Sequence, residues 1–119
     1  APECPHGVCG PPPTPIDPEP GCDPKPILSE LSRRRRAFAA CYERVIKSGQ
    51  SGLKGKLVLH LSIGSAGRVT NASLDEDSVG EPLLSSCVLS TASHWVFPMA
   101  DQCSGMEFAF PIVFQQSSQ

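Results

Sequence analysis

The sequence predicts an α+β fold in which a three-stranded antiparallel sheet carries two helices on one face, in the order α-β-β-α-β. Apolar residues alternate over residues 56–63 and 106–114, as they do in strands with one buried face. They recur at helical spacing over residues 31–45 and 84–95. These segments define a folding unit at residues 27–114, a size at which a single core is adequate and a crosslink adds stability.

The first helix is expected to end at Ser48-Gly49, where glycine follows the last apolar position. Its buried stripe consists of Leu31, Phe38, Cys41, Tyr42 and Val45. Pro82 suits the first position of the second helix, because a proline there loses no intrahelical hydrogen bond. The second stripe consists of Leu84, Cys87, Val88, Thr91 and Trp95. Both helices are therefore expected to cover the same face of the sheet.

The strands between and after the helices are predicted from the alternation of apolar and polar residues. Leu57, Leu59, Leu61 and Ile63 share one face, and the segment 64–67 (GSAG) then turns the chain. The returning strand places Val69, Ala72 and Leu74 inward with one step out of register, which predicts a bulge near Thr70 or Asn71. The last strand has an apolar face formed by Met106, Phe108, Phe110, Ile112 and Phe114. Pro111 marks it as an edge strand or a bulged one, because proline cannot donate to a ladder.

Six cysteines in so short a chain indicate an oxidising compartment. Cys41 and Cys87 are the first choice for a disulfide, because each belongs to a helix stripe that faces the same sheet. The other four leave their pairing open. One assignment joins Cys4 to Cys9 in a short loop and Cys22 to Cys103, which pins the N-terminal arm ahead of the last strand.

Residues 1–26 are expected to form an extended, proline-rich and cysteine-containing linker or arm, and residues 115–119 a polar tail. Ten of the thirteen prolines fall in this first segment, which has few apolar residues to bury. Fast backbone motion is therefore expected over residues 1–21. Four of its side chains, Cys4, His6, Cys9 and Cys22, also have the chemistry of a zinc site. Their spacing is loose, so disulfides are favoured and no metal or other cofactor is expected.

The distribution of charged and apolar residues gives no support for nucleic-acid binding, a membrane span or a calcium loop. The net charge of −2 implies no general affinity for nucleic acid, and no stretch approaches the roughly 20 apolar residues of a membrane span. The run Arg33–Arg36 is interpreted as a solvated helix surface, because successive helical residues spread around the circumference. The acidic segment formed by Asp75, Glu76, Asp77 and Glu81 lacks the pattern of a calcium loop and is interpreted as a polar connector.

No arrangement typical of an enzyme is present. The chain has no nucleophile elbow, no zinc-protease motif and no phosphate-binding glycine loop. His60 and His94 have no acidic or cysteine partner close in sequence and are interpreted as surface residues. Trp95, Phe97 and Phe110 follow the periodicity of core positions rather than of a ligand-binding patch. A non-enzymatic binding module is therefore the leading hypothesis.

The order of these motifs resembles the C-terminal domain of the TonB family of energy transducers. The resemblance covers residues 28–114 and is carried by GKLVLHLSIGSAGRVTNASL, by Trp95-x-Phe97-Pro98 and by the final FPIVF. The helix cysteines, in CYERVIKSG and SSCVLSTASHWVFP, are most similar to the AgmX/PglI branch known from myxobacterial gliding motility.

The resemblance implies a periplasmic or cell-envelope domain in a Gram-negative-type bacterium, either part of a force or transport transducer or secreted. Its expected partners are an outer-membrane or envelope protein and, through a membrane anchor elsewhere, an inner-membrane proton-channel complex. A homodimer through strands is a further possibility. The alternative is a secreted or lipid-anchored disulfide-stabilised structural or adaptor module in a cell-envelope or gliding-motility complex. A fully covered last strand would favour a purely structural crosslinked spacer.

Relatives of this kind grip an extended partner peptide along the last strand. The expected contact segment here is the edge Glu107, Phe108, Ala109 and Phe110, whose free backbone groups precede Pro111.

Overall fold

In a computed structural model of the chain, which describes residues 7–16, 22–49, 53–98 and 105–115, one antiparallel sheet packs against helices. The helical segments are α1 (Lys25–Arg34), the 3₁₀ turn η2 (Arg35–Ala37), α2 (Phe38–Lys47) and α3 (Pro82–Ser93). The first three follow one another without a break and form the first predicted helix. The α+β class and the two helices that pack against the sheet are therefore as predicted.

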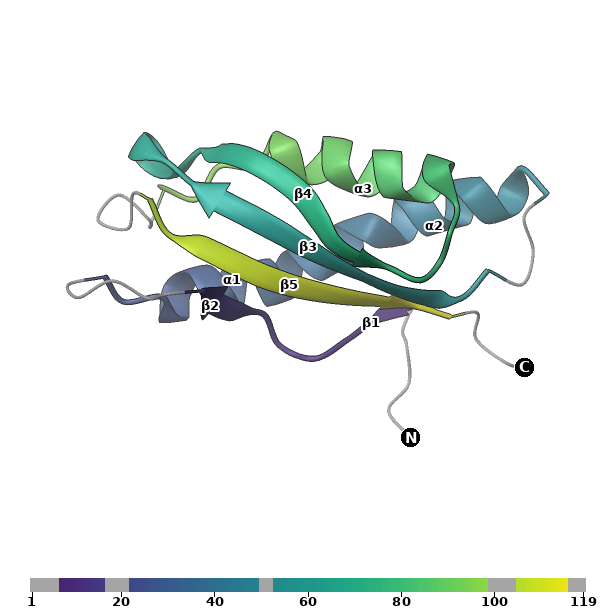
Figure 1. Cartoon of the computed structure of the whole chain (residues 1–119), viewed down its shortest axis with the longest axis horizontal. Helices are drawn as coiled ribbons and strands as arrows, with labels where there is room; N and C mark the ends of the chain where they lie inside the picture. The colour runs from purple at the N-terminus through teal and green to yellow at the C-terminus, as the bar shows by residue number, and fades with distance from the viewer. Residues whose placement is uncertain (1–6, 17–21, 50–52, 99–104, 116–119) are drawn as a thin grey trace.

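Within the described residues the sheet has five strands rather than the predicted three. They are β1 (Val8–Cys9), β2 (Thr14–Ile16), β3 (Gly55–Ile63), β4 (Val69–Asp77) and β5 (Glu107–Phe114), in the order β1-β5-β3-β4 with β2 also paired to β5. Figure 1 shows β1 and β2 alongside β5, on the side away from β3. The two additional strands come from the proline-rich arm.

One face of the sheet is buried beneath the helices. Alternate residues of β3 and β5 are almost fully excluded from solvent, as are the inward residues of α1, α2 and α3. The helix and hairpin stripes identified in the sequence supply most of this core. Removing this apolar surface from water supplies the main driving force for the fold. The opposite face of the sheet carries no helix among the described segments and is partly exposed.

The hairpin between β3 and β4 contains two register shifts. Ser62 pairs with Asn71 and Ile63 with Val69, so Thr70 is the extra residue of the bulge expected near that position. A second shift between Val58 and Leu59 was not predicted. The turn itself is η3 (Ser65–Gly67), in which Gly67 adopts a φ of +73°. The carbonyl of Gly67 accepts a 2.7 Å hydrogen bond from the Phe97 amide.

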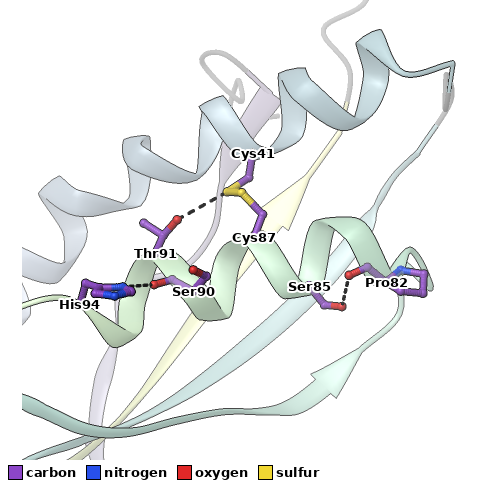
Figure 2. The surroundings of a disulfide bond; sticks show 7 residues. All are labelled: Cys41, Pro82, Ser85, Cys87, Ser90, Thr91 and His94. Atoms are coloured by element: carbon purple, nitrogen blue, oxygen red, sulfur yellow. Dashed lines mark hydrogen bonds between the residues drawn. A yellow bond between two sulfur atoms is a disulfide. The ribbon is translucent and has the colours of Figure 1, made fainter.

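A disulfide joins Cys41 of α2 to Cys87 of α3, the pair chosen from the sequence. Figure 2 shows the bond crossing between the two helices, with the Thr91 hydroxyl directed at the Cys41 sulfur. The two Cα atoms are 5.7 Å apart, within the range that disulfides span. Cys9 and Cys22 are also disulfide-bonded, whereas Cys4 and Cys103, their expected partners, lie outside the described residues.

Candidate partner-binding edge

The outer side of β5 is the edge from which the sequence predicts partner binding, and the structure shows that it is not free. Thr14, Pro15 and Ile16 of β2 pair with Ala109, Phe108 and Glu107. Val8 and Cys9 of β1 pair with Phe114 and Val113. The prediction of an open edge at Glu107–Phe110 is therefore wrong for this conformation. The arm was expected to be an unpaired linker because it has few apolar side chains to bury. Its backbone N–H and C=O groups can nevertheless pair with a strand, whatever the side chains are.

The backbone groups that face the arm can be assigned from the alternation of a strand. The Pro111 carbonyl accepts a bond from Arg35 and the Gln115 amide donates to the Gly7 carbonyl, both on the arm side. The Met106 carbonyl, just before β5, instead accepts a hydrogen bond from the Ile63 amide, on the side that faces β3. Because alternate residues direct their N–H and C=O groups to opposite neighbours, Glu107, Ala109, Pro111 and Val113 face the arm.

The two arm strands do not form one continuous ladder. Residues 10–13 of the arm lie opposite residues 110–112 of β5, so the arm carries one extra residue between β1 and β2. Pro111 lies in this interval, where its nitrogen has no hydrogen to donate. A Cβ on Gly10 would lie 2.9 Å from the Pro111 carbonyl oxygen, so the arm approaches β5 closely here only because it has a glycine.

Arg35 connects this interruption to the helical layer. Its guanidinium donates to the carbonyl of Pro11 in the arm and, at 3.1 Å, to the carbonyl of Pro111 in β5. It also lies over the Phe110 ring, 5.0 Å from the ring centre. Burial lowers the pKa of Arg35, and its Nε has no hydrogen-bond partner among the described residues. Arg35 thus replaces the backbone donor that Pro111 lacks and holds the arm at the same time.

The arginine run is not the uniformly solvated surface expected from the sequence. Arg34 donates through Nε to Glu30 at 2.8 Å and through Nη2 to the Val96 carbonyl at 3.1 Å. Its guanidinium stacks 4.4 Å from the centre of the Phe97 ring. Only Arg33 and Arg36 of the run project into solvent. The inward pair was missed because its partners are carbonyls and rings far along the chain.

Trp95, Phe97 and Phe110 behave as core residues, as their periodicity predicted. The Phe97 and Phe110 side chains are fully buried, and Trp95 is within 6.5 Å of both rings, measured between ring centres. Together with Phe38 they support β5 from beneath. An aromatic layer therefore packs beneath β5. The residues whose side chains lie on the open face of the strand are only partly buried: Glu107, Ala109, Pro111 and Val113.

The open face of the sheet carries a carboxylate–histidine–carboxylate bridge that sequence reasoning missed. His60 in β3 pairs through Nδ1 with Asp75 of β4 at 3.0 Å, and through Nε2 with Glu107 of β5 at 2.5 Å. These carboxylates raise the pKa of His60, Glu107 contributing most. Their separations from His60 are 15 and 47 residues, so only the strand pairing brings them together. His94, in contrast, is exposed and donates to the Ser90 carbonyl at the end of α3.

These groups do not form a metal site. No three His, Cys, Asp or Glu side chains within residues 7–16, 22–49, 53–98 and 105–115 are arranged to hold an ion. His60 directs its two nitrogens to carboxylates on opposite sides, so the three side chains do not converge on one point. Asp75 and Asp77 are exposed, and Glu81 accepts from the Leu83 amide at the start of α3. Of the zinc candidates, Cys4 and His6 lie outside the described residues.

Comparison of the chain with protein-family models, with curated proteins and with solved structures found no match. The support for a function therefore comes from the outer edge of β5 and from the strands β1 and β2 that pair with it. Within the part of the chain that the structure describes, no helix has both the length and the apolar character needed to cross a membrane. The Cys41–Cys87 disulfide is consistent with an oxidising compartment.

The raised pKa of His60 predicts that stability falls as the pH rises through neutrality. A pKa above the ordinary 6.5 means that the folded state holds the proton more tightly. The stabilisation is therefore complete below pH 6.5 and is lost as the pH rises through the folded-state pKa. Urea unfolding between about pH 5.5 and 8.5 measures it, with an expected loss of less than about 1 kcal/mol because the site is near the surface. His60→Gln should remove the pH slope, and an NMR titration midpoint at or below 6.5 would refute the prediction.

Proposed function

We propose that this chain is a non-enzymatic protein-binding domain of the bacterial cell envelope, similar to the C-terminal domains of TonB-like transducers. It engages an extended segment of an outer-membrane or envelope partner along the outer edge of β5. The observation that supports this most is that β5 already pairs there with extended segments, β1 and β2. The backbone donors and acceptors that hold these segments would hold an extended partner strand in their place.

The shape of the edge supports a short, reversible contact. Glu107 and Ala109 face outward with both backbone groups, whereas Pro111 interrupts the donors after them. A partner strand therefore has room for a ladder of only a few residues before the interruption. Selectivity for the side chains of the partner would come from the open face of the sheet. There Ala109 lies between Thr14 of β2 and His60 of β3, and His60 is bonded to Glu107.

A crosslinked structural or adaptor module, secreted or lipid-anchored, is the second candidate. The covering of β5 by β1 and β2 favours it, because an edge that stays covered has nothing to offer a partner. The two functions differ in whether β2 leaves β5. They also differ in the requirement for an inner-membrane proton channel, which only the transducer would engage, through an anchor.

Replacing Ala109 with proline tests the binding role. The change removes the N–H that faces the outer edge and leaves the buried Phe108 and Phe110 in place. A photo-crosslinking amino acid at Pro111, on the open face of β5, should capture an envelope protein in the producing cells. The Ala109→Pro variant should reduce that adduct about tenfold, since at least one ladder hydrogen bond is lost together with its geometry.

The matched control carries the same photo-crosslinker at Ser86, an exposed position of α3 on the other side of the molecule. Adducts of equal yield at Pro111 and Ser86, or an adduct at Pro111 that Ala109→Pro does not alter, would contradict recognition through β5. Unchanged thermal unfolding of the variant by circular dichroism shows that the loss is not a loss of fold.

A further inference from the structure

We propose that β2 is a displaceable placeholder: the chain inhibits its own binding edge with the segment 10–16, and Arg35 is the latch that holds this segment closed. This inference rests on the proposed function, since it names what a partner strand must replace. It follows from a difference in the way that the two arm strands are attached.

The strand β1 is anchored by burial. Val8 is 6% exposed and belongs to the hydrophobic core. Gly7 is buried so tightly against the Tyr42 ring that a Cβ would lie 2.7 Å from it, and the Gly7 carbonyl accepts from the Gln115 amide at 3.0 Å. Cys9 adds a disulfide bond. To remove β1, the protein must expose apolar surface and break into the layer beneath α2.

The strand β2 lacks such anchors. Thr14 is exposed, and Pro15 and Ile16 are half-buried. No residue of β2 belongs to the core. Among the described residues, it is held by backbone pairing with Glu107 and Ala109 and, just before it, by the Arg35 bond to the Pro11 carbonyl. Segments with few buried apolar contacts open at a lower free energy than the rest of a fold.

The prolines of the arm suit a removable cover. Thr14 and Ile16 lie opposite Ala109 and Glu107, the residues that face the arm, so Thr14 and Ile16 direct their backbone groups to β5. Pro15, between them, turns its nitrogen to the outside, where the missing donor prevents a further strand from adding. The segment thus closes the edge of β5 without creating a new one, and when it leaves, the full set of backbone groups on Glu107 and Ala109 becomes available.

Arg35 sets how firmly the cover is held. It bonds to the arm and to β5 at once, at the point where Pro111 leaves the ladder without a donor. Its buried Nε is unsatisfied among the described residues, so the closed state leaves part of the guanidinium uncompensated. Within the segment 10–16 only the Pro13 side chain is buried, so opening exposes little apolar surface. The segment 10–16 can detach from β5 while Cys9 and Cys22 stay crosslinked.

Hydrogen exchange in the full, oxidised chain tests the placeholder without any partner. The amides of Thr14, Ile16, Glu107 and Ala109 should exchange through a local opening whose rate is insensitive to low concentrations of denaturant. The amides of Val113 and Gln115, which face β1, should exchange only through a larger, denaturant-sensitive opening. If all six amides exchange together in the global unfolding transition, β2 is a fixed part of the sheet and the proposal is overturned.

Two variants weaken the attachment of the segment 10–16 without substituting any residue of β5. Thr14→Pro removes the arm N–H that faces Ala109, and Arg35→Gln removes the charged donor of the latch. Each should raise exchange at Glu107 and Ala109 about tenfold, because each removes a hydrogen bond that holds the segment 10–16. Pro15→Ala and Arg36→Gln are matched controls, because the Pro15 nitrogen faces outward and Arg36 is exposed. Equal effects of variant and control would overturn the assignment of the latch.

The same variants separate this inference from the proposed function. With the photo-crosslinker at Pro111, Thr14→Pro should increase the partner adduct, whereas Ala109→Pro decreases it. A decrease with Thr14→Pro would show that β2 belongs to the binding surface and would overturn the placeholder while leaving partner recognition intact. If no variant yields an adduct, recognition through β5 fails, and the exchange data alone then decide whether β2 opens.

Discussion

Replacing both Cys41 and Cys87 with alanine is expected to lower the free energy of unfolding by about 4 kcal/mol in the chain-entropy model of crosslinks. The two residues are 46 positions apart, so the bond closes a long loop that contains β3 and β4 and removes many conformations from the unfolded chain. It also joins α2 to α3, the two helices that cover the sheet. For a domain of this size, such a loss is a large part of the total stability.

Guanidinium unfolding of the oxidised protein and of the double variant measures this loss. Alanine retains the Cβ of each cysteine and leaves the volume of the sulfur atom empty, so a smaller packing loss at the buried Cys41 adds to the entropic term. Peptide mapping without reduction must first recover Cys41 and Cys87 in one crosslinked peptide. Recovery of either cysteine as a free thiol, or bonded to an arm cysteine, would contradict the assignment. So would a double variant that is as stable as the parent.

Gly67→Ala is expected to destabilise the fold by about 3 kcal/mol, because the substitution combines overpacking with a strained backbone. An alanine Cβ at this position would overlap the Phe97 carbonyl oxygen, which no packing tolerates. The backbone must then move, and the hydrogen bond from the Phe97 amide to the Gly67 carbonyl is lost with it. Because Phe97 is fully buried, the displacement reaches the aromatic layer beneath β5.

Gly80→Ala is the matched control. Gly80 has a φ of +75°, almost the same as that of Gly67, but among the described residues no atom beyond its chain neighbours lies within 4 Å of the position that a Cβ would take there. Its substitution should therefore cost only the backbone term, about 1 kcal/mol. The difference between the two variants in thermal or denaturant unfolding isolates the contact with Phe97. Equal losses would show that the close approach of the hairpin turn to Phe97 contributes nothing.

The parts of the fold that were predictable are those with a long, regular pattern. The alternation from Leu57 to Ile63 and from Phe108 to Phe114 identifies β3 and β5, because each has one face against the helices and one face open. The stripes of the two helices identified Cys41 and Cys87 as inward neighbours. In each case several residues repeat one physical requirement, so the signal accumulates along the chain.

The arm strands had no such signal. β1 and β2 have two and three residues, too few to show a period, and their prolines are typical of a linker. Their pairing depends on a tertiary partner, β5, about 100 residues away along the chain by the strand registers. The roles of Arg35 and His60 escaped prediction for the same reason. Their partners are carbonyl and carboxylate groups that only the assembled sheet brings within reach.

The central claim is that an extended partner segment occupies the outer edge of β5 in place of β2. The most direct measurement is amide hydrogen exchange of the chain alone and in complex with the protein captured at Pro111. We expect Thr14 and Ile16 to lose protection in the complex while Glu107 and Ala109 keep theirs, because a partner strand takes over their hydrogen bonds. A complex in which all four amides exchange as they do in the free chain would contradict the claim.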